Sequence, residues 1–252
     1  MSAERLVTLL QIERAAVAGW PGLETEMVDG WLWRYASGGS VRANSVAALD
    51  YSGRDFDGSV ARIEALYRAR GATACFTISE VSRPAGLDEA LAQRGYARGD
   101  DHVTLAKRIT ASPEPHAPAL GVETADRPST GWLAAYLSGL SANRREIAPR
   151  ILAGLPRAAV YVSAVRSGVV IASGMTIPDG RLASIQCMAT LPEARRQGAA
   201  LAVLAEIERL ATAYGCDTLY LQTDRDNPAA VTLYERFGCT LAGHYHTRRR
   251  QL

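Results

Sequence analysis

A small-residue turn at residues 191–201, which read LPEARRQGAAL, is the first candidate site. Three small residues fall where a helix is expected to begin: Gly198, Ala199 and Ala200. Backbone N–H groups at a helix start have no partner within the helix, and together with the helix dipole they bind anions. Arg195 and Arg196 would add positive charge beside them. The turn is therefore a candidate phosphate site, and an ordinary strand-to-helix turn with exposed arginines is the alternative.

A second candidate lies at residues 227–238, which read NPAAVTLYERFG. Asn227 suits the N-cap of a helix and Pro228 suits its first turn. On such a helix Ala230 and Tyr234 are four residues apart and share a face. A ligand could then pass close to the backbone beside a phenol. Taken alone, this tyrosine fits a core or surface position at least as well.

The elements around these two segments alternate as in an α/β domain. β-Branched and aromatic runs predict strands at residues 159–165, 169–177, 181–190 and 218–223. Apolar residues at helical spacing predict an amphipathic helix over 198–214, which Gly215 would end, and a second helix over 227–237. Tight turns join the first three strands, so a mixed sheet is expected.

The first half of the chain repeats this order of elements. Its pattern predicts a hairpin of residues 31–35 and 45–49, a helix at 59–70, a strand at 74–81 and a helix at 86–93. Residues 90–108 also resemble residues 232–250, because both run from a helix end through glycine into a strand with a basic finish. We therefore expect an internal duplication.

Residues 109–119, which read ITASPEPHAPA, separate the two halves. Their prolines fix φ and remove backbone donors, so the segment predicts a semi-rigid linker. The expected organisation is an N-terminal domain of residues 1–108, a Pro-rich linker of residues 109–119 and a C-terminal domain of residues 120–252.

Taken together, the two candidate segments resemble the Gcn5-related N-acetyltransferase (GNAT) family. The resemblance is carried by Arg195-x-x-Gly198-x-Ala200 after one strand and Asn227-x-x-Ala230-x-x-Leu233-Tyr234 after the next. It implies the acyl-CoA N-acyltransferase fold, an α/β fold with a mixed, mostly antiparallel central sheet flanked by helices. The first half resembles a second, degenerate copy of it, because it lacks the anion turn and has Ala92 where Tyr234 would align.

The resemblance also implies a cofactor, acetyl-CoA, and the residues that would bind it. The CoA pyrophosphate would lie on the backbone of residues 196–200, the pantetheine arm on residues 188–190 and near Asn227, and the thioester sulfur near Tyr234. The implied cofactor-binding residues are Met188, Ala189, Thr190, Arg195, Arg196, Gln197, Gly198, Ala199, Ala200, Asn227 and Ala230, and the implied catalytic residue is Tyr234.

These residues predict an acetyl-CoA-dependent N-acetyltransferase in which a primary amine attacks the thioester directly in a ternary complex. A strand amide would stabilise the oxyanion, and Tyr234 would protonate the departing CoA thiolate as general acid. Many family members carry a glutamate where this chain has Gln222 or Gln186, and neither amide takes a proton at neutral pH. The general base is therefore unassigned. The alternative is a non-catalytic acyl-CoA-binding regulatory or interaction module of the same fold.

Composition limits the other function classes. The 252 residues are 48% apolar and 21% charged, with a formal net charge of +2, which gives no basis for nucleic-acid or membrane partners. The four cysteines form no CxxC pair and fit reduced thiols in a cytoplasmic protein without a secretion signal. The expected partner is a small-molecule or peptide amine, and a homodimer is an open alternative to a monomer.

Three further groups of residues have structural interpretations. His244 and His246 alternate on the expected last strand, but no cysteine or carboxylate cluster joins them in the sequence, so no metal site is expected. The arginines at 248–250 are expected to form a solvated tail. Residues around a Gly-rich hairpin are expected to serve the core and its turns, with the acceptor pocket as the alternative: Trp31, Trp33, Arg34, Arg42 and Asn44.

Overall fold

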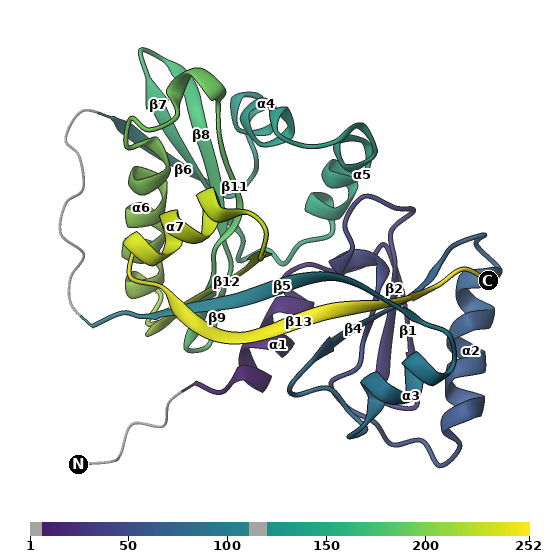
Figure 1. The fold of residues 1–252 in the computed structure, drawn as a ribbon. Coiled ribbons are helices and arrows are strands. Elements are labelled where there is room, and N and C mark those ends of the chain that lie inside the picture. The colour runs from purple at the N-terminus through teal and green to yellow at the C-terminus, as the bar shows by residue number, and fades with distance from the viewer. Residues whose placement is uncertain (1–6, 111–119) are drawn as a thin grey trace, which may run out of the picture.

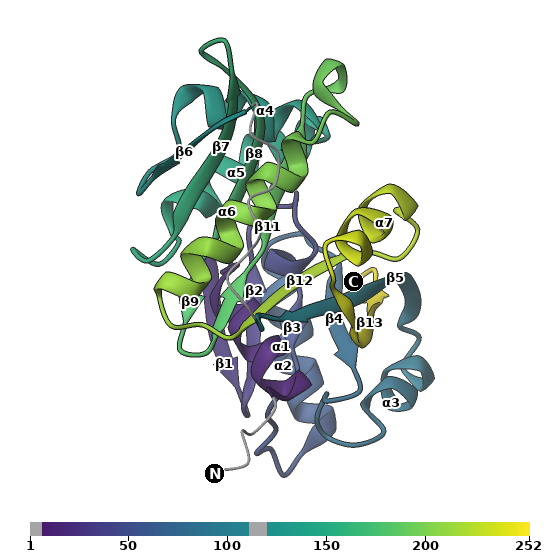
Figure 2. The same ribbon diagram turned by 90° about the vertical axis from the view of Figure 1, so that its left-hand side faces the viewer.

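The computed structural model describes residues 7–110 and 120–252, and its helices and strands alternate along the chain (Figure 1). Figure 2 shows the same molecule from the side. Most of the linker expected at 109–119 lies outside the described residues. Within the described stretches, every helix is too short or too polar to cross a lipid bilayer.

One large sheet joins the two halves of the chain. In the described residues its spatial order is β1 (Glu24–Val28), β2 (Trp31–Tyr35), β3 (Val46–Ala47), β4 (Ala74–Ser79), β13 (Thr240–Arg250), β5 (Ala97–Arg108), β12 (Thr218–Asp224), β10 (Leu182–Ser184) and β9 (Pro178–Asp179). The long strands β5 and β13 cross the middle of the molecule together (Figure 1). The C-terminal strand therefore lies inside the sheet of the first half.

The centre of this sheet is symmetric with respect to the two halves. β3 pairs parallel with β4 (Val46 opposite Phe76), as β10 pairs parallel with β12 (Ser184 opposite Tyr220). β4 pairs antiparallel with β13, β12 pairs antiparallel with β5, and β13 and β5 pair antiparallel with each other. Each half thus inserts its last strand into the sheet of the other, as an internal duplication allows. The expected mixed, mostly antiparallel sheet is confirmed.

A second sheet belongs to the second half alone. Its order in the described residues is β11 (Gln186–Thr190), β8 (Val169–Thr176), β7 (Val160–Arg166) and β6 (Gly121–Ala125). α6 (Ala199–Ala213) packs on one face, in a core with Val162 and Ala164. α4 (Thr130–Ser138) and α5 (Ala142–Ala153) lie on the other face, in a core with Tyr161 and Met175. Because alternate residues of β7 point to opposite faces, both faces of the sheet are buried.

The first half builds its own core from its strands and from α2 (Phe56–Arg68) and α3 (Leu87–Gln93). Trp31 and Trp33 are buried in this core. Asn44 holds the loop after β2, because its side chain accepts from Ala36 N and donates to Ser40 O. The core and turn roles expected for these three residues are confirmed.

The structure begins with a helix that the sequence did not predict, α1 (Leu9–Ala18). It begins with a capping box formed by Thr8 and Gln11, which satisfies backbone donors at the helix start. Ile12 packs in a cluster with Tyr220 of β12. The first helix of the chain therefore belongs to the core of the second half.

Two local expectations are wrong, and a third is confirmed only in part. The strand expected at 181–190 is divided at Ile185, because β10 pairs with β12 whereas β11 pairs with β8 in the other sheet. The antiparallel pairing expected between residues 31–35 and 45–49 is present but short: β2 meets β3 where Leu32 faces Ala47, and β2 pairs along its length with β1. The arginines at 248–250 form no solvated tail, because β13 extends to Arg250 and Arg248 pairs with Asp88.

Candidate active site

Two parallel strands of the second half diverge at the centre of the molecule. β10 and β12 pair as far as Ser184 and Tyr220, and Ile185 N donates to Tyr220 O at 2.8 Å. Beyond this point the chain continues as β11 into the second sheet, while β12 continues beside β5. The residues that follow the divergence, Gln186 on β11 and Gln222 on β12, therefore flank its closed end.

β11 carries a bulge next to this point. Its register with β8 shifts between Gln186 and Ala189, and Cys187 has a φ of +54°. Ser173 Oγ donates to Cys187 O at 3.1 Å, which holds the bulged backbone. A bulge leaves a residue outside the regular ladder. Cys187 and Met188 fall within this register shift, so a backbone amide here is a candidate oxyanion donor.

The start of α6, residues 195–200, is a candidate anion-binding turn, and we call it the anion cradle. Gly198, at the N-cap, has a φ of +83°, and Arg196 has a φ of +57°. Left-handed residues close together turn successive N–H groups toward one point, which binds anions. No side chain caps this helix and its first turn has no acidic residue. A Cβ on Gly198 would find no atom within 4 Å, so there is open space at the N-cap.

Side chains of the same turn hold its shape. Gln197 Oε1 accepts from Arg166 Nη1 at 2.6 Å, and Gln197 Nε2 donates to Glu193 O at 2.8 Å. Arg195 Nε reaches Thr190 O at 3.4 Å, and both Arg195 and Arg196 are exposed. Two guanidinium groups therefore lie at the rim of the cradle, where they can meet phosphate groups.

α7 (Pro228–Arg236) lies on the other side of the divergence. The side chain of Asn227 accepts from Ala230 N at 3.2 Å, which confirms the expected N-cap. Tyr234 is 7% exposed and belongs to a core cluster with Ala199 of α6. Met188 and Ala230 pack against the same cluster. The structure thus brings together residues expected at the site from β11, α6 and α7.

Burial in this cluster raises the pKa of the Tyr234 phenol. The hydroxyl therefore stays protonated at neutral pH and can donate a hydrogen bond. The structure is compatible with both interpretations of Tyr234, since the ring is a core residue and the same cluster includes residues expected to bind the cofactor.

Helix α1 of the first half lies against the two glutamines that flank the divergence of the strands. Glu13 accepts hydrogen bonds from Gln222 Nε2, at 3.1 Å to each carboxylate oxygen, and from Thr104 Oγ1 at 2.9 Å. At the end of the helix, Gly19 O accepts from Gln186 Nε2 at 3.2 Å. The Glu13 carboxylate, from the first half, is therefore in contact with Gln222, one of the two positions where many family members carry a glutamate.

Sequence reasoning missed Glu13. The signal was available, because a charged residue lies on the apolar side of a helix next to Ile12 and three positions before Ala16, both buried. The sequence did not predict helix α1, and no pattern linked this helix to the strand expected at 218–223. Only tertiary structure shows that residues 13 and 222 are in contact.

Metal ligands are not gathered in the described residues, where no group of three or more His, Cys, Asp and Glu side chains could hold an ion. His246 Nε2 instead lies 2.7 Å from Asp88 Oδ1. Cys75, Cys216 and Cys239 are buried free thiols, and Cys187 is half-buried at the bulge.

Diverging parallel strands, a bulge and an uncapped helix start make up a fold that this chain shares with solved GNAT structures. Residues 8–250 match the family described as "Probable histone acetyltransferase Rv0428c C-terminal", and the chain belongs to this family. It is 29% identical over 244 residues to "Uncharacterized N-acetyltransferase YobR" of Bacillus subtilis (strain 168), a match covering 94% of this chain and 97% of that protein.

Solved structures show the same fold. A GCN5-related N-acetyltransferase from Kribbella flavida superposes with a TM-score of 0.71 at 14% identity, over 97% of this chain and 96% of that chain. A tandem GNAT protein from the clavulanic acid biosynthesis pathway superposes with a TM-score of 0.59 at 15% identity, over 82% of this chain and 75% of that chain. The tandem GNAT architecture is therefore shown by the fold.

Proposed function

We propose that the protein transfers the acetyl group of acetyl-CoA to a primary amine, and that the second half holds the single working site. The observation that carries the proposal is the divergence of β11 and β12 beside the uncapped start of α6. Acetyl-CoA supplies an activated thioester. The chain supplies the anion cradle, the amide at the bulge and a buried phenol.

The turn at 195–200 would hold the CoA pyrophosphate. Its donors are the backbone N–H groups of Gly198, Ala199 and Ala200, with Arg195 and Arg196 at the rim. Residues 188–190 would hydrogen-bond the pantetheine arm, and Asn227 would lie near it. Because its oxygen caps α7, the Asn227 amide nitrogen is the part free to donate.

Two groups would serve the acyl transfer itself. The Met188 amide would donate to the oxyanion that forms on the thioester carbonyl. The Tyr234 hydroxyl would donate to the departing CoA sulfur, and its raised pKa keeps that proton in place at neutral pH. Holding amine and thioester together supplies most of the rate, up to roughly 7–11 kcal/mol.

The first half would bind no CoA. The helix that corresponds to α6 is α2, and one of its N-terminal donors is already used: Asp55 caps the helix by accepting from Gly58 N at 3.0 Å. Asp57 adds a second carboxylate to the first turn. Both charges would repel a pyrophosphate.

The experiment that tests the proposal has two parts. Calorimetry with acetyl-CoA measures binding, and thiol release from acetyl-CoA with a panel of amines, including lysine peptides, measures transfer. Binding with amine-dependent thiol release is expected. Binding without release for any amine would favour the non-catalytic acyl-CoA-binding module, and absence of binding would contradict both.

A further inference from the structure

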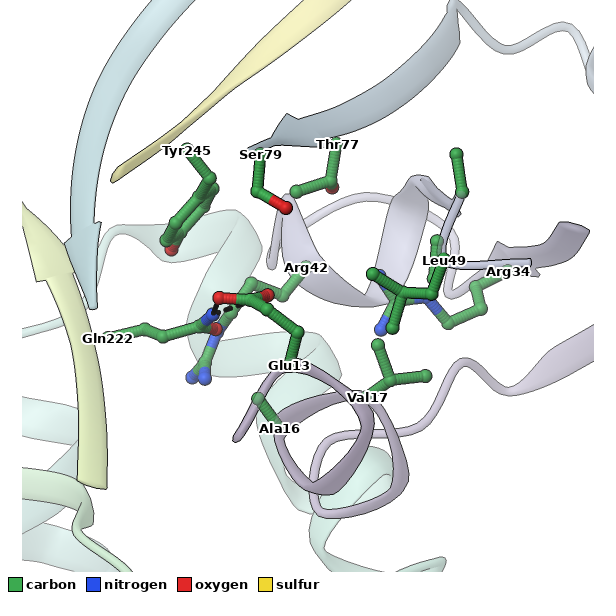
Figure 3. Close-up of a pocket in the computed structure, with 12 residues that line it drawn as sticks. Glu13, Ala16, Val17, Arg34, Arg42, Leu49, Thr77, Ser79, Gln222 and Tyr245 are labelled. Atoms are coloured by element: carbon green, nitrogen blue, oxygen red, sulfur yellow. Dashed lines mark hydrogen bonds between the residues drawn. The ribbon is translucent and has the colours of Figure 1, made fainter. Parts of the chain in front are cut away.

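A cavity between the two halves is lined by charged side chains that form no ion pair with one another. Its wall includes Glu13, Arg34, Arg42, Gln222 and Tyr245 (Figure 3). In residues 7–110 and 120–252, none of the ion pairs joins Glu13 to either arginine. A buried charge without an opposite partner is costly, so charges left apart around a cavity point to a ligand.

The negative charge of the cavity belongs to Glu13, which is 4% exposed. Its hydrogen-bond donors, Gln222 Nε2 and Thr104 Oγ1, are both neutral. Burial raises the pKa of the carboxyl, which makes the carboxylate a stronger base than an exposed glutamate. Glu13 is thus equipped to hold an ammonium group and to take its proton.

The positive charges of the cavity belong to Arg34 and Arg42. Arg34 is 3% exposed, donates only to neutral groups of Ser45 (O at 3.0 Å, Oγ at 3.2 Å), and burial lowers its pKa to about 10, so it remains charged at neutral pH. The Arg42 guanidinium lies 5.4 Å from the centre of the Trp20 ring. Burial raises the pKa of the Cys187 thiol to about 12, and the charge of Arg42 opposes this rise.

We infer that this cavity is the acceptor subsite, and that it selects a compact primary amine carrying an anionic group, such as an α-amino acid. The ammonium would lie at Glu13 and the anionic group at Arg34 and Arg42. The inference rests on the proposed function. The cavity is small, which favours a compact acceptor over a folded protein.

The position of the cavity fits this role. Gln222 is the second residue after Tyr220, where the pairing of β10 and β12 ends, so Glu13 lies at the closed end of the divergence.

Glu13 accepts one proton from the ammonium, and the nitrogen lone pair then forms the C–N bond while the C–S bond breaks. The electron pair of that bond goes to sulfur, which takes a proton from Tyr234. One of the two protons left on nitrogen then leaves and restores Tyr234 through solvent, while the other stays as the amide N–H; the products are the amide, CoA thiol and protonated Glu13.

The first experiment uses the unmodified protein and matched acceptors. The probes are α-amino acids, their α-amides and their decarboxylated amines, each assayed for thiol release with acetyl-CoA and titrated by calorimetry into the protein–CoA complex. We expect kcat/KM for the best amino acid to exceed that of its amide at least tenfold, with a matching difference in Kd. Equal values for acid and amide would overturn the inference.

The second experiment uses variants of the cavity. Arg42→Gln should lower kcat/KM for the amino acid at least tenfold and leave the amide unchanged, while Arg42→Lys should keep part of the preference. Glu13→Gln should lower kcat for both acceptors, with Glu13→Asp retaining more activity. The control is Arg14→Gln, an exposed neighbour on α1 that pairs with Asp50, and it should change neither value.

The outcomes separate this inference from the proposed function. Unchanged CoA affinity in each variant shows that the cofactor site is intact. An equal loss for acid and amide in Arg42→Gln would indicate a structural role and overturn the inference. Efficient acetylation of amines without an anionic group would overturn it while the proposed function stands, whereas absence of both CoA binding and thiol release would remove the proposed function itself.

Discussion

Asp88 of α3 accepts two hydrogen bonds from the guanidinium of Arg248 in β13, from Nε at 2.6 Å and from Nη2 at 3.1 Å. His246 of the same strand lies 2.7 Å from this carboxylate. A helix of the first half therefore holds the strand that the second half inserts into its sheet. The contact stabilises the strand exchange on which the central sheet depends.

Replacing this carboxylate should weaken the fold in a pH-dependent way. The hydrogen bonds from Arg248 hold the pKa of Asp88 at about 2, below its ordinary 3.8. Because the folded-state pKa is depressed, the stabilisation is present above about pH 4 and is lost as pH falls toward 2. Asp88→Asn should therefore lower the free energy of unfolding at pH 7 by on the order of 1–2 kcal/mol.

Urea unfolding of wild type and Asp88→Asn at pH 7 and at low pH measures this effect. The difference between the two proteins should shrink as pH falls from about 4 to 2. Asp100→Asn is the control, since the Asp100 side chain is 75% exposed beside Arg249. A difference that stays constant with pH would contradict the assignment of the stabilisation to the ionised carboxylate.

A carboxylate in the anion cradle should abolish CoA binding. Gly198→Asp places a negative charge at the start of α6, and two like charges about 4 Å apart repel by about 4 kcal/mol at an effective dielectric near 20. We expect CoA binding to fall below detection by calorimetry, since about 4 kcal/mol is a loss of roughly a thousandfold in affinity. Gly215→Asp is a matched control at the other end of α6, since Gly215 also has a positive φ, of 77°, and open space around it. Equal affinity in the two variants would remove the cradle as the pyrophosphate site.

The chain should bind one CoA molecule. The start of α2 is capped by Asp55, whereas the start of α6 is not capped by any side chain. Calorimetric titration of the whole protein should therefore give one equivalent per chain, and Gly198→Asp should reduce it to none. A second equivalent, or one that survives in that variant, would show that the first half binds CoA.

Tyr234→Phe separates an enzyme from a binding module. The change removes the hydroxyl and keeps the ring in its cluster with Ala199 and Val203. Loss of a general acid lowers kcat by ~10²–10⁴-fold, and CoA affinity should stay unchanged. Tyr214→Phe, at an exposed tyrosine after α6, controls for loss of a phenol. A kcat equal to wild type in Tyr234→Phe would leave Tyr234 a core residue only.

Restoring the family's glutamate at position 222 should destabilise the protein. Gln222→Glu would put a second carboxylate against Glu13, whose pKa is already raised by burial. Two adjacent carboxylates share a proton, so the folded-state pKa of the pair rises above the unfolded value. Stability is then present below about pH 4 and is lost as pH rises through the folded pKa. The Tm of Gln222→Glu should fall below wild type at pH 8 by more than at pH 5.

Parts of the fold depend on short-range signals, and these could be predicted. Gly198 and Gly215 mark the limits of α6, and Asn227 with Pro228 marks the start of α7, because helix caps depend on neighbouring residues. The likeness of residues 90–108 to 232–250 also predicted a duplication, and those segments include the paired strands β5 and β13.

The division of the strand at Ile185 could not be predicted in this way. Residues 182–190 form a continuous strand-like run, and nothing local shows that its two parts pair with different sheets. The contact of Glu13 with Gln222 joins residues 209 positions apart. The sequence by itself determined which residues begin the helices of the proposed cofactor site. Tertiary structure decided which carboxylate reaches that site, because strand exchange between the halves brings α1 against β12, and no local pattern encodes a contact made by folding two distant segments together.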